Sequence, residues 1–548
     1  MNDFSPLTAT ERLCQLGPLD ILVVAPAGCG KTQVLAERAA SLVATKHVES
    51  PRKLLALTFS NKARDNLAER LKQVMPSRDR ALVSVTNFHG LAGRLVRAHG
   101  AVLGIDPQIG FPERGTHERM RVAAGINYKV KSMRAKAEVA NQALFAAKTG
   151  LWDDEEVLLR IADSRSREAV NYQQALQDAN LMDYDDLLRY GALLLNDPRV
   201  ARLYREHFSA VLVDEVQDLS PLQLGMVQAI GSGRTTYAGD LAQGIYGFAG
   251  ARPKKVFDAI KESAPEIINL DLSYRSSPEV LAAVNALARE MGVAELRCAR
   301  PESWQNTVTG VEFLVSEDEI DEAGTLLRDF QQTLAREPTV SIGVAARRFD
   351  RLTPLVKLLT TANVDYQNWY RPAYVPKISH VLQRHLQEAT AYGPDSATQL
   401  AKLAQLCRHE IGTEDASSHD ELSVALEALQ EVLDEGASLV QAVLASRVVA
   451  ADTDAPVSPG LHLLTGHAGK GQEFDVVYVV GLEEGHIPDF RCSTFEEFEE
   501  ELRVLHVMAS RAKSRLTFTR VENRYRTPTW YAAEVPSRWW STLTGERP

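Results

Sequence analysis

The sequence predicts an α/β protein with two parallel β-sheets, each interrupted by a helical insertion. Short apolar runs alternate with helical patterns in the first hundred residues, the alternation returns in a second half of the chain, and a helical stretch interrupts each half. Strands that alternate with helices favour a parallel sheet with helices on its faces. The 548 residues suffice for roughly three to four compact units.

The first half begins with the apolar run Ile21–Val24, a loop of small residues and a helical pattern through Val43. Further strands are expected at 53–58, 81–85, 210–213 and 235–238, with helices at 61–75 and 88–98. From about 99 to 180 the strand pattern fades, and helices are expected at 136–148 and 155–179. We therefore predict a first lobe from 1–98 and 181–262, with a helical insertion at 99–180.

The second half repeats this organisation. Strands are expected at 266–270, 310–315, 340–344, 461–465 and 476–480. The helical, acidic stretch 376–454 interrupts them, so we predict a second lobe from 263–375 and 455–548 with a reduced insertion at 376–454. The tail, with Trp530, Trp539 and Trp540, is expected to be helical or irregular.

The loop after the first strand has the pattern of a phosphate-binding loop. It consists of Ala25, Pro26, Ala27, Gly28, Cys29, Gly30, Lys31 and Thr32. In such a loop the backbone N–H groups and the helix N-terminus face an anion, the lysine reaches the β- and γ-phosphates, and the threonine hydroxyl ligates Mg²⁺. The alternative is an ordinary glycine turn, which the flanking strand and helix disfavour.

Asp214 and Glu215 follow the buried run Val211–Val213. A carboxylate at a strand end beside a phosphate loop holds Mg²⁺ through water, so Thr32 and Asp214 are the predicted metal-binding residues. Glu215 is placed to polarise an attacking water. The competing interpretation is a solvated acidic pair at a strand end. The continuation of the motif into Gln217 and Asp218 disfavours that interpretation.

Composition limits the class of protein. No apolar run approaches the ~18 residues of a membrane span, so we expect no membrane partner. No signal-peptide pattern opens the chain, and five scattered cysteines form no structural-metal or disulfide spacing, which fits the cytoplasm. The net charge of −11 excludes a uniformly basic surface but not a local nucleic-acid groove. Basic residues gather between 112 and 136, whereas 409–446 holds nine acids and no lysine or arginine.

Eight segments follow one another in the order of a known motif series. They are 25–32, 57–63, 87–99, 214–218, 239–251, 270–276, 465–474 and 510–512. Together they resemble the UvrD/Rep family of superfamily-one DNA helicases over roughly residues 5–375 and 455–520. The resemblance implies two RecA-like P-loop NTPase lobes, with ATP and Mg²⁺ as cofactors and single-stranded DNA as partner.

The resemblance also implies roles for single residues. Lys31, Asp214, Glu215, Gln243, Arg275 and Arg511 would be catalytic, the last three at the γ-phosphate, where guanidinium groups suit charge spread over equatorial oxygens. Tyr274 would stack on adenine and Glu473 would hold the ribose. DNA would stack on Phe59, Tyr246 and Phe248, and its backbone would contact Asn61, Lys62, His89 and His467. Because Arg275 and Arg511 belong to the second half, both halves would contribute to ATP hydrolysis.

Departures from the family pattern leave the biological role open. Ala249 replaces an arginine, Glu11 stands near the expected adenine-reading glutamine, and the second insertion is short and acidic. The expected function is a 3′–5′ translocase or helicase in DNA repair, replication or recombination, with a repair protein as a further partner. One alternative is a regulatory ATPase subunit that works with a nuclease in a Gabija-like anti-phage complex. Another is a nucleotide switch whose slow turnover ignores DNA.

Overall fold

The computed structural model describes residues 8–112, 114–127, 133–247, 250–264, 266–369, 376–393, 395–411, 457–527 and 530–545, with ten further positions between 422 and 443. The chain forms two compact units, Met1–Asp271 and Leu272–Pro548, called here the first and second lobes. Within the described ranges, no helix combines the length and apolar character needed to cross a membrane. All five cysteines are free thiols.

The first lobe contains a six-stranded parallel sheet with the order β3-β2-β4-β5-β1-β6. Its strands are β1 Ile21–Val24, β2 Lys53–Thr58, β3 Val83–Asn87, β4 Phe208–Val213, β5 Thr235–Gly239 and β6 Glu266–Asn269. The central strands are almost wholly buried, which explains their continuous apolar runs. The α/β fold class predicted for this half is therefore confirmed.

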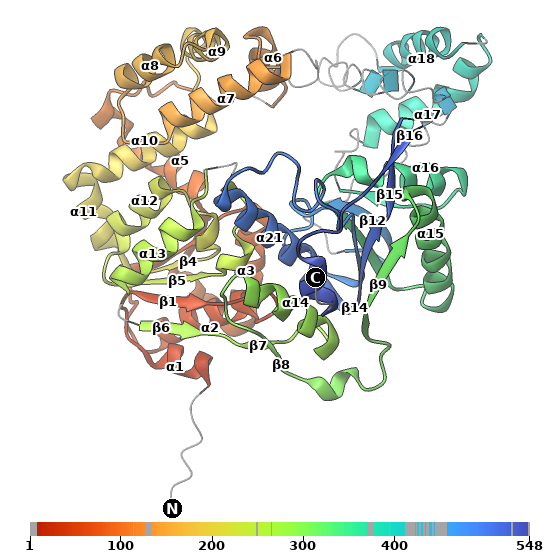
Figure 1. The fold of residues 1–548 in the computed structure, drawn as a ribbon. Helices are drawn as coiled ribbons and strands as arrows, with labels where there is room; N and C mark the ends of the chain where they lie inside the picture. Colours follow the sequence, from red (N-terminus) through yellow and green to blue (C-terminus); the bar gives the residue numbers. More distant parts are fainter. Residues whose placement is uncertain are drawn as a thin grey trace, which may run out of the picture. The chain divides into compact units, whose positions relative to one another are not determined.

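Helices cover both faces of this sheet (Figure 1). They are α1 Ala9–Gln15, α2 Lys31–Ala44, α3 Asn61–Val74, α4 Ser77–Arg80, α5 Phe88–His99, α10 Tyr184–Asn196, α11 Pro198–His207, α12 Pro221–Gly231 and α13 Pro253–Ser263. The buried guanidinium of Arg38 on α2 donates to the carbonyls of Leu13 and Gly17, at distances of 2.9 and 2.7 Å. This arginine fastens the amino-terminal helix to the helix that follows the phosphate loop.

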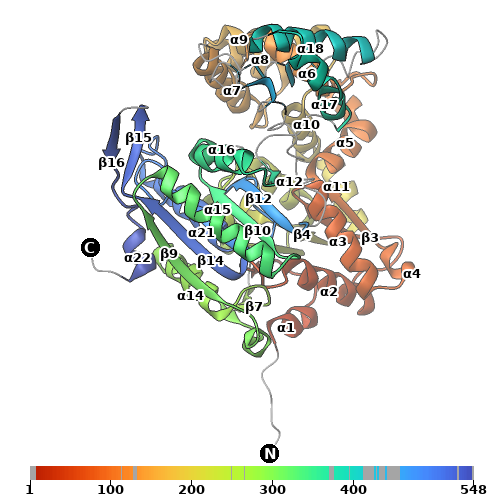
Figure 2. The same ribbon diagram turned by 90° about the vertical axis from the view of Figure 1, so that its right-hand side faces the viewer.

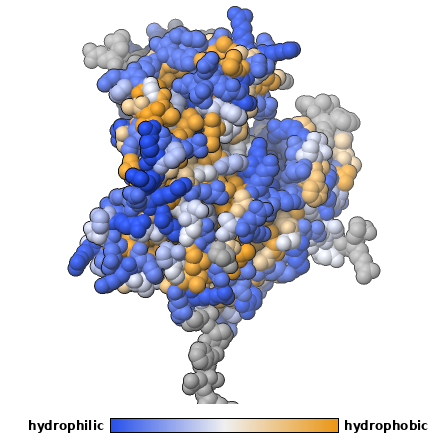
Figure 3. Space-filling model, turned by 90° about the vertical axis from the view of Figure 1, so that its left-hand side faces the viewer, coloured by the Kyte–Doolittle hydropathy of each residue, from blue (hydrophilic) through white to orange (hydrophobic). Residues whose placement is uncertain are grey.

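Among the described residues of the first-lobe insertion, four α-helices pack around a small core of their own. They are α6 Arg114–Ala123, α7 Arg134–Lys148, α8 Asp154–Asp163 and α9 Arg167–Asp178. The helix expected at 155–179 is thus two helices, because Ser166 caps the second one by accepting the N–H of Ala169. The face in Figure 3 is largely hydrophilic, and its apolar patches are scattered, as on most soluble proteins.

A buried charge cluster joins this insertion to the lobe. The ammonium of Lys148, at the end of α7, lies 2.7 Å from Asp183 and 2.8 Å from Asp186. Asp183 caps α10, and Asp186 lies in its first turn. Because all three side chains are buried, the cluster fixes α7 against α10.

The second lobe also contains a six-stranded parallel sheet, with the order β11-β12-β10-β13-β14-β9 (Figure 2). Its strands are β9 Gly310–Ser316, β10 Ser341–Ala346, β11 Gln367–Asn368, β12 Gly460–Thr465, β13 Phe474–Val480 and β14 Ala512–Val521. The main helices are α14 Pro278–Glu290, α15 Glu319–Arg336, α16 Thr353–Thr361 and α21 Phe495–Ala509. In the predicted insertion, α17 Pro376–Thr390 and α18 Ser396–Ile411 pack around a separate apolar cluster.

Three sequence-based expectations were wrong in detail. The strand expected at 266–270 was assigned to the second lobe, but β6 pairs with β1, so the first lobe extends past 262. The ten-residue strand β14 was not predicted. The tail forms a hairpin, β15 Asn523–Thr527 and β16 Trp530–Ala533, before the short α22 Trp540–Thr544. A two-stranded ribbon of β7 Leu272–Ser273 and β8 Arg297–Cys298 opens the second lobe.

Candidate functional site

The predicted phosphate loop lies between β1 and α2, at the carboxyl edge of the first sheet. Gly28 and Gly30 have φ angles of +85° and +74°, in the left-handed region that favours glycine. Gly30 is the N-cap of α2 and offers no side-chain cap. The first N–H groups of the helix therefore remain available to an anion, as a phosphate site requires.

Lys31 opens α2 and forms ion pairs with the two carboxylates that directly follow β4. Its ammonium lies 2.5 Å from Oε2 of Glu215 and 3.4 Å from Oδ1 of Asp214. Burial disfavours the charged lysine, but the two carboxylates outweigh it and raise the pKa of Lys31 above its ordinary value. The lysine is therefore a permanent cation in the middle of the site.

Glu215 has an unusual backbone. Its φ of +55° places a residue other than glycine in the left-handed region, directly after β4. Its carboxylate accepts a short hydrogen bond from the Gln217 amide. The strained turn and the amide together hold the Glu215 carboxylate beside Lys31.

A chain of hydrogen bonds continues from Gln217 to β5. The side-chain carbonyl of Gln217 accepts the backbone N–H of Asp240 at 3.0 Å. The Asp240 carboxylate in turn accepts a side-chain N–H of Gln243 at 2.8 Å. Gln243 is a predicted catalytic residue, whereas no role was predicted for Gln217 or Asp240. These two buried residues connect Glu215 with Gln243 across neighbouring strands. The one sequence signal for Gln217 and Asp240 was that they lie within the motif segments 214–218 and 239–251.

The donor set fits a hard divalent cation. Asp214 is a buried carboxylate, and burial raises its pKa despite the nearby Lys31. Burial likewise raises the pKa of Asp240, although Gln243 opposes it. Such carboxylates gain stability from an added positive charge. Together with the hydroxyl of Thr32 in the first turn of α2, Asp214 offers the oxygen ligands that Mg²⁺ prefers.

A second group of predicted residues meets within the second lobe. Arg275 donates to Oε1 of Glu473 at 2.6 Å and to the carbonyl of Ser510 at 3.1 Å. Burial opposes the charge of Glu473, but Arg275 outweighs it and lowers the pKa of this carboxyl. Tyr274 is largely exposed, with the guanidinium of Arg300 over its ring.

Arg511 lies beside this group but is only 2% exposed. Its guanidinium donates to the carbonyl of Val507 at 2.9 Å and to the hydroxyl of Ser510 at the same distance. The arginine thus binds the last turn of α21. To contact a phosphate, it would have to exchange some of these bonds.

The predicted DNA-binding residues of the first lobe form two aromatic groups. The rings of Phe59 and Tyr246 are stacked, with centroids 5.7 Å apart and planes inclined by 13°. His89 meets the ring of Tyr184 edge-on at 5.4 Å, and burial lowers the pKa of His89, which keeps it neutral at pH 7. Tyr184 is 64% exposed and was not predicted, although it begins a helix directly after a capping aspartate.

The remaining candidates are spread over both lobes. Asn61 accepts an N–H of Asn87 at 2.9 Å, which joins the turns after β2 and β3, and Lys62 is its partly buried neighbour. His467 is partly buried, two residues after β12. Phe248 and Ala249 lie outside the described residues, as do Lys129 and Lys131 of the basic stretch.

The predicted residues occupy different edges of the two sheets. Strands β10, β12 and β13 end together, because Ala346 is in register with Thr465 and with Val480, and His467 follows this carboxyl edge. Glu473 and Arg511 instead precede Phe474 and Ala512, which pair at the amino edge. In the first sheet, the phosphate loop, the acids and Phe59 all follow carboxyl ends.

Comparison with known proteins completes the description of the site. The family model described as the UvrD/REP helicase N-terminal domain matches residues 10–264, and that of the UvrD-like helicase C-terminal domain matches residues 365–523. DNA helicase II of Escherichia coli (strain K12) is 26% identical over 94% of this chain and 85% of its own length. DNA helicase II of Salmonella typhimurium (strain LT2) has the same values. ATP-dependent DNA helicase UvrD2 of Mycobacterium tuberculosis (strain H37Rv) is 27% identical over 96% of this chain and 79% of its own.

Proposed function

The chain belongs to the UvrD/Rep family of DNA helicases, and from this premise we propose that it hydrolyses ATP with Mg²⁺ to move 3′–5′ along single-stranded DNA. The observation that supports this most is the ion-paired group of Lys31, Asp214 and Glu215 at the end of the phosphate loop, in which Asp214 is buried and the other two side chains are partly exposed. It combines the cation, the metal-binding carboxylate and the water-polarising carboxylate that phosphoryl transfer to water needs.

In the first lobe, each polar group has a distinct proposed task. Bound Mg²⁺ would neutralise phosphate charge, with Thr32 and Asp214 as its protein ligands. Lys31 would exchange carboxylate partners for phosphate oxygens, which frees Glu215 to accept a proton from the attacking water. The hydrogen bonds through Gln217 and Asp240 would keep Glu215 and Gln243 in a fixed relation during this exchange.

The second lobe would supply the cations that stabilise charge on the transferred phosphoryl group. We assign this task to Arg275 and Arg511, and assign adenine stacking and ribose binding to Tyr274 and Glu473. Support comes from the ion pair that already joins Arg275 to Glu473. Hydrolysis removes the group that the two arginines bind, and this loss would drive the movement.

Single-stranded DNA would cross the carboxyl edge of the first sheet. The stacked rings of Phe59 and Tyr246 offer π-faces to bases, while Asn61, Lys62 and the neutral His89 offer donors to the backbone. His467 would have the same role in the second lobe. Family membership makes repair, replication or recombination of DNA the proposed setting.

The second insertion favours one other candidate function. Its described helices, α17 and α18, enclose an apolar cluster of their own, and the stretch 409–446 contains nine acids without a lysine or arginine. Such an acidic composition suits a protein partner better than a duplex. The chain would then be the regulatory ATPase subunit of a Gabija-like complex with a nuclease.

The decisive experiment compares ATPase rates without DNA, with single strands and with duplex, for the wild type and Lys31→Ala. We expect single strands to stimulate the wild type and no condition to stimulate the variant. Equal wild-type rates in all three conditions would exclude a translocase and favour a nucleotide switch. Displacement of a block from the 5′ end but not the 3′ end of a strand tests the 3′–5′ direction. Robust unwinding by the isolated chain would count against the regulatory subunit.

A further inference from the structure

The loop between β13 and α21 presents an aromatic ring between two arginines. Phe490 is 67% exposed, although large apolar side chains are usually covered. The guanidinium carbons of Arg348 and Arg491 lie 4.9 and 5.6 Å from the centre of its ring. The ring therefore has cationic neighbours and a large open surface, which is the combination that bases stack on in single-strand binders.

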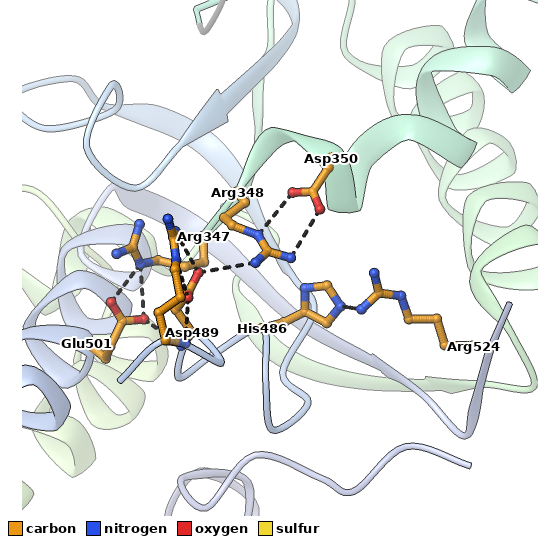
Figure 4. A network of polar contacts seen from close by, with 8 residues as sticks. Arg347, Arg348, Asp350, His486, Asp489, Glu501 and Arg524 are labelled. Carbon is orange, nitrogen blue, oxygen red and sulfur yellow. Dashed lines mark hydrogen bonds and ion pairs between the residues drawn. The ribbon is translucent and has the colours of Figure 1, made fainter. Parts of the chain in front are cut away.

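A buried carboxylate fixes this arrangement. Asp489 accepts two hydrogen bonds from the guanidinium of Arg491, at 2.9 and 3.1 Å. It also accepts one from Arg348 at 3.4 Å, and Figure 4 shows Arg348 and Glu501 beside this carboxylate. Its own N–H donates to Glu501 on α21 at 3.0 Å, and Glu501 in turn binds Arg347. Ordering of the loop before a ligand arrives lowers the entropy cost of binding.

The position of the loop in the sheet indicates the ligand. Arg348 follows β10 and Phe490 follows β13, and these strands end in register at Ala346 and Val480. His467 follows β12 at the same carboxyl edge. The group of Arg275, Glu473 and Arg511 lies at the opposite end of β13. This strand has seven residues and is therefore roughly 23 Å long. Phe490 is thus on the side of the sheet proposed for DNA and too far away to contact ATP.

The surroundings favour a base over other ligands. Next to the ring stand charged side chains, whereas the core of a protein interface is depleted of charge. The first turn of α21 adds Glu496 and Glu497, which repel phosphate. A stacked base needs only the π-face and carries no charge itself.

We propose that Phe490 stacks on a base of single-stranded DNA in the second lobe, with Arg348 and Arg491 holding the ring in place. The assignment rests on the proposed function and adds to it a stacking residue that the motif series does not contain. Because stacking releases no counterions, Phe490 should contribute the same factor to affinity at every salt concentration.

Anisotropy of fluorescently labelled oligo(dT) tests this proposal on the full chain at a low and a high salt concentration. Phe490→Leu keeps an apolar side chain without a π-face and should weaken binding about tenfold at both salt concentrations. Phe490→Trp should bind as tightly as the wild type. The matched control is Phe495→Leu, since Phe495 is 72% exposed in the same segment; it should change affinity less than twofold.

Three outcomes overturn the proposal: wild-type affinity in Phe490→Leu, an equal loss in Phe495→Leu, or a loss that depends on salt. Unchanged affinity in Phe490→Leu would indicate that the exposed ring contacts a protein partner instead of a base. Melting temperatures verify that the exposed substitutions leave the fold intact. If the wild type itself fails to bind oligo(dT), the proposed function fails, which separates that failure from this one.

Discussion

The first lobe places all its predicted chemistry at one edge of its sheet, whereas the second lobe divides it between two edges. In the first, the phosphate loop and Phe59 follow strands β1 and β2, and Asp214 donates its N–H to Leu57 of β2 at 2.9 Å. In the second, Arg275 lies at the amino edge and His467 at the carboxyl edge. Under the proposed function, a change at the phosphate would reach DNA through one turn in the first lobe, but only along whole strands in the second.

The two groups of residues that we propose to bind the nucleotide also differ in charge. Lys31 stands among three carboxylates, those of Asp214, Glu215 and Asp240. In the second lobe, Arg275 forms an ion pair with Glu473, and the charges of Lys513 and Arg511 act on the same carboxylate from farther away. The first group therefore needs added cations before it can hold a triphosphate, while the second brings positive charge of its own.

The largest effect is expected from Lys31→Ala. Without the lysine, the carboxylates of Asp214 and Glu215 lose the cation that balances them, so nucleotide affinity and turnover should both fall, turnover by about a thousandfold. ATPase assays and equilibrium nucleotide binding measure the two quantities. Lys72→Ala removes an exposed lysine of the same lobe and should change neither.

Arg275→Ala tests the other half of the comparison. If this arginine acts on charge that develops during hydrolysis, turnover should fall by roughly a hundredfold to a thousandfold. Nucleotide affinity should change only severalfold. Arg275→Lys should not restore turnover, since a lysine lacks the two-pronged geometry. Arg289→Ala, an exposed arginine on α14, is the control. A loss of affinity as large as that of Lys31→Ala would remove the distinction between the lobes.

Acid should affect the second lobe through His506. This histidine on α21 is fully buried, and burial, with Arg511 close by, lowers its pKa to about 3. The unfolded chain takes up the proton near pH 6.5. The contribution to stability is therefore complete above that pH and is lost as the pH falls from 6.5 towards 3. At pH 5 the loss is about 2 kcal/mol.

Denaturant unfolding of wild type and His506→Leu at pH 7.5 and pH 5 measures this loss. The variant should lose less stability than the wild type between the two conditions. An equal loss in both proteins would show that the acid sensitivity comes from other groups.

The smallest effect concerns the stacked pair of the first lobe. Phe59→Leu and Tyr246→Leu should each weaken binding of single strands about tenfold. Because the rings contact each other, the double variant should lose less than the product of the single losses. Affinity for oligo(dT) measures all three variants, with the exposed Tyr392→Leu as control. Independent losses would show that the two rings bind separate bases.

Much of this organisation could be predicted from the sequence because buried strands are continuous apolar runs. Strand β14 was missed because Lys513, Arg515 and Thr517 occupy alternate positions. The assignment of β6 depends on which sheet the chain returns to, and a single apolar run carries no such information.

The motif series located most of the candidate side chains but not their contacts. The hydrogen bonds of Gln217 and Asp240 join strands that are distant in sequence, so they follow only from the strand order. Nor did the sequence reveal that the guanidinium of Arg511 is buried against the Val507 carbonyl of the preceding helix α21. Phe490 belongs to no quoted motif, and its importance emerges only from its exposure between two arginines.

The left-handed backbone at Glu215 sets the proposed activity of this residue against the stability of the fold. An ordinary side chain in this conformation costs about 1 kcal/mol, which glycine would not pay. Two carboxylates side by side add repulsion, which Lys31 relieves. Selection for thermal resistance alone would therefore tend to replace this glutamate and, under the proposed function, abolish ATP hydrolysis. A laboratory search for heat-stable variants of this chain should retain an activity screen at every round, or it will enrich sturdy proteins that no longer turn over ATP.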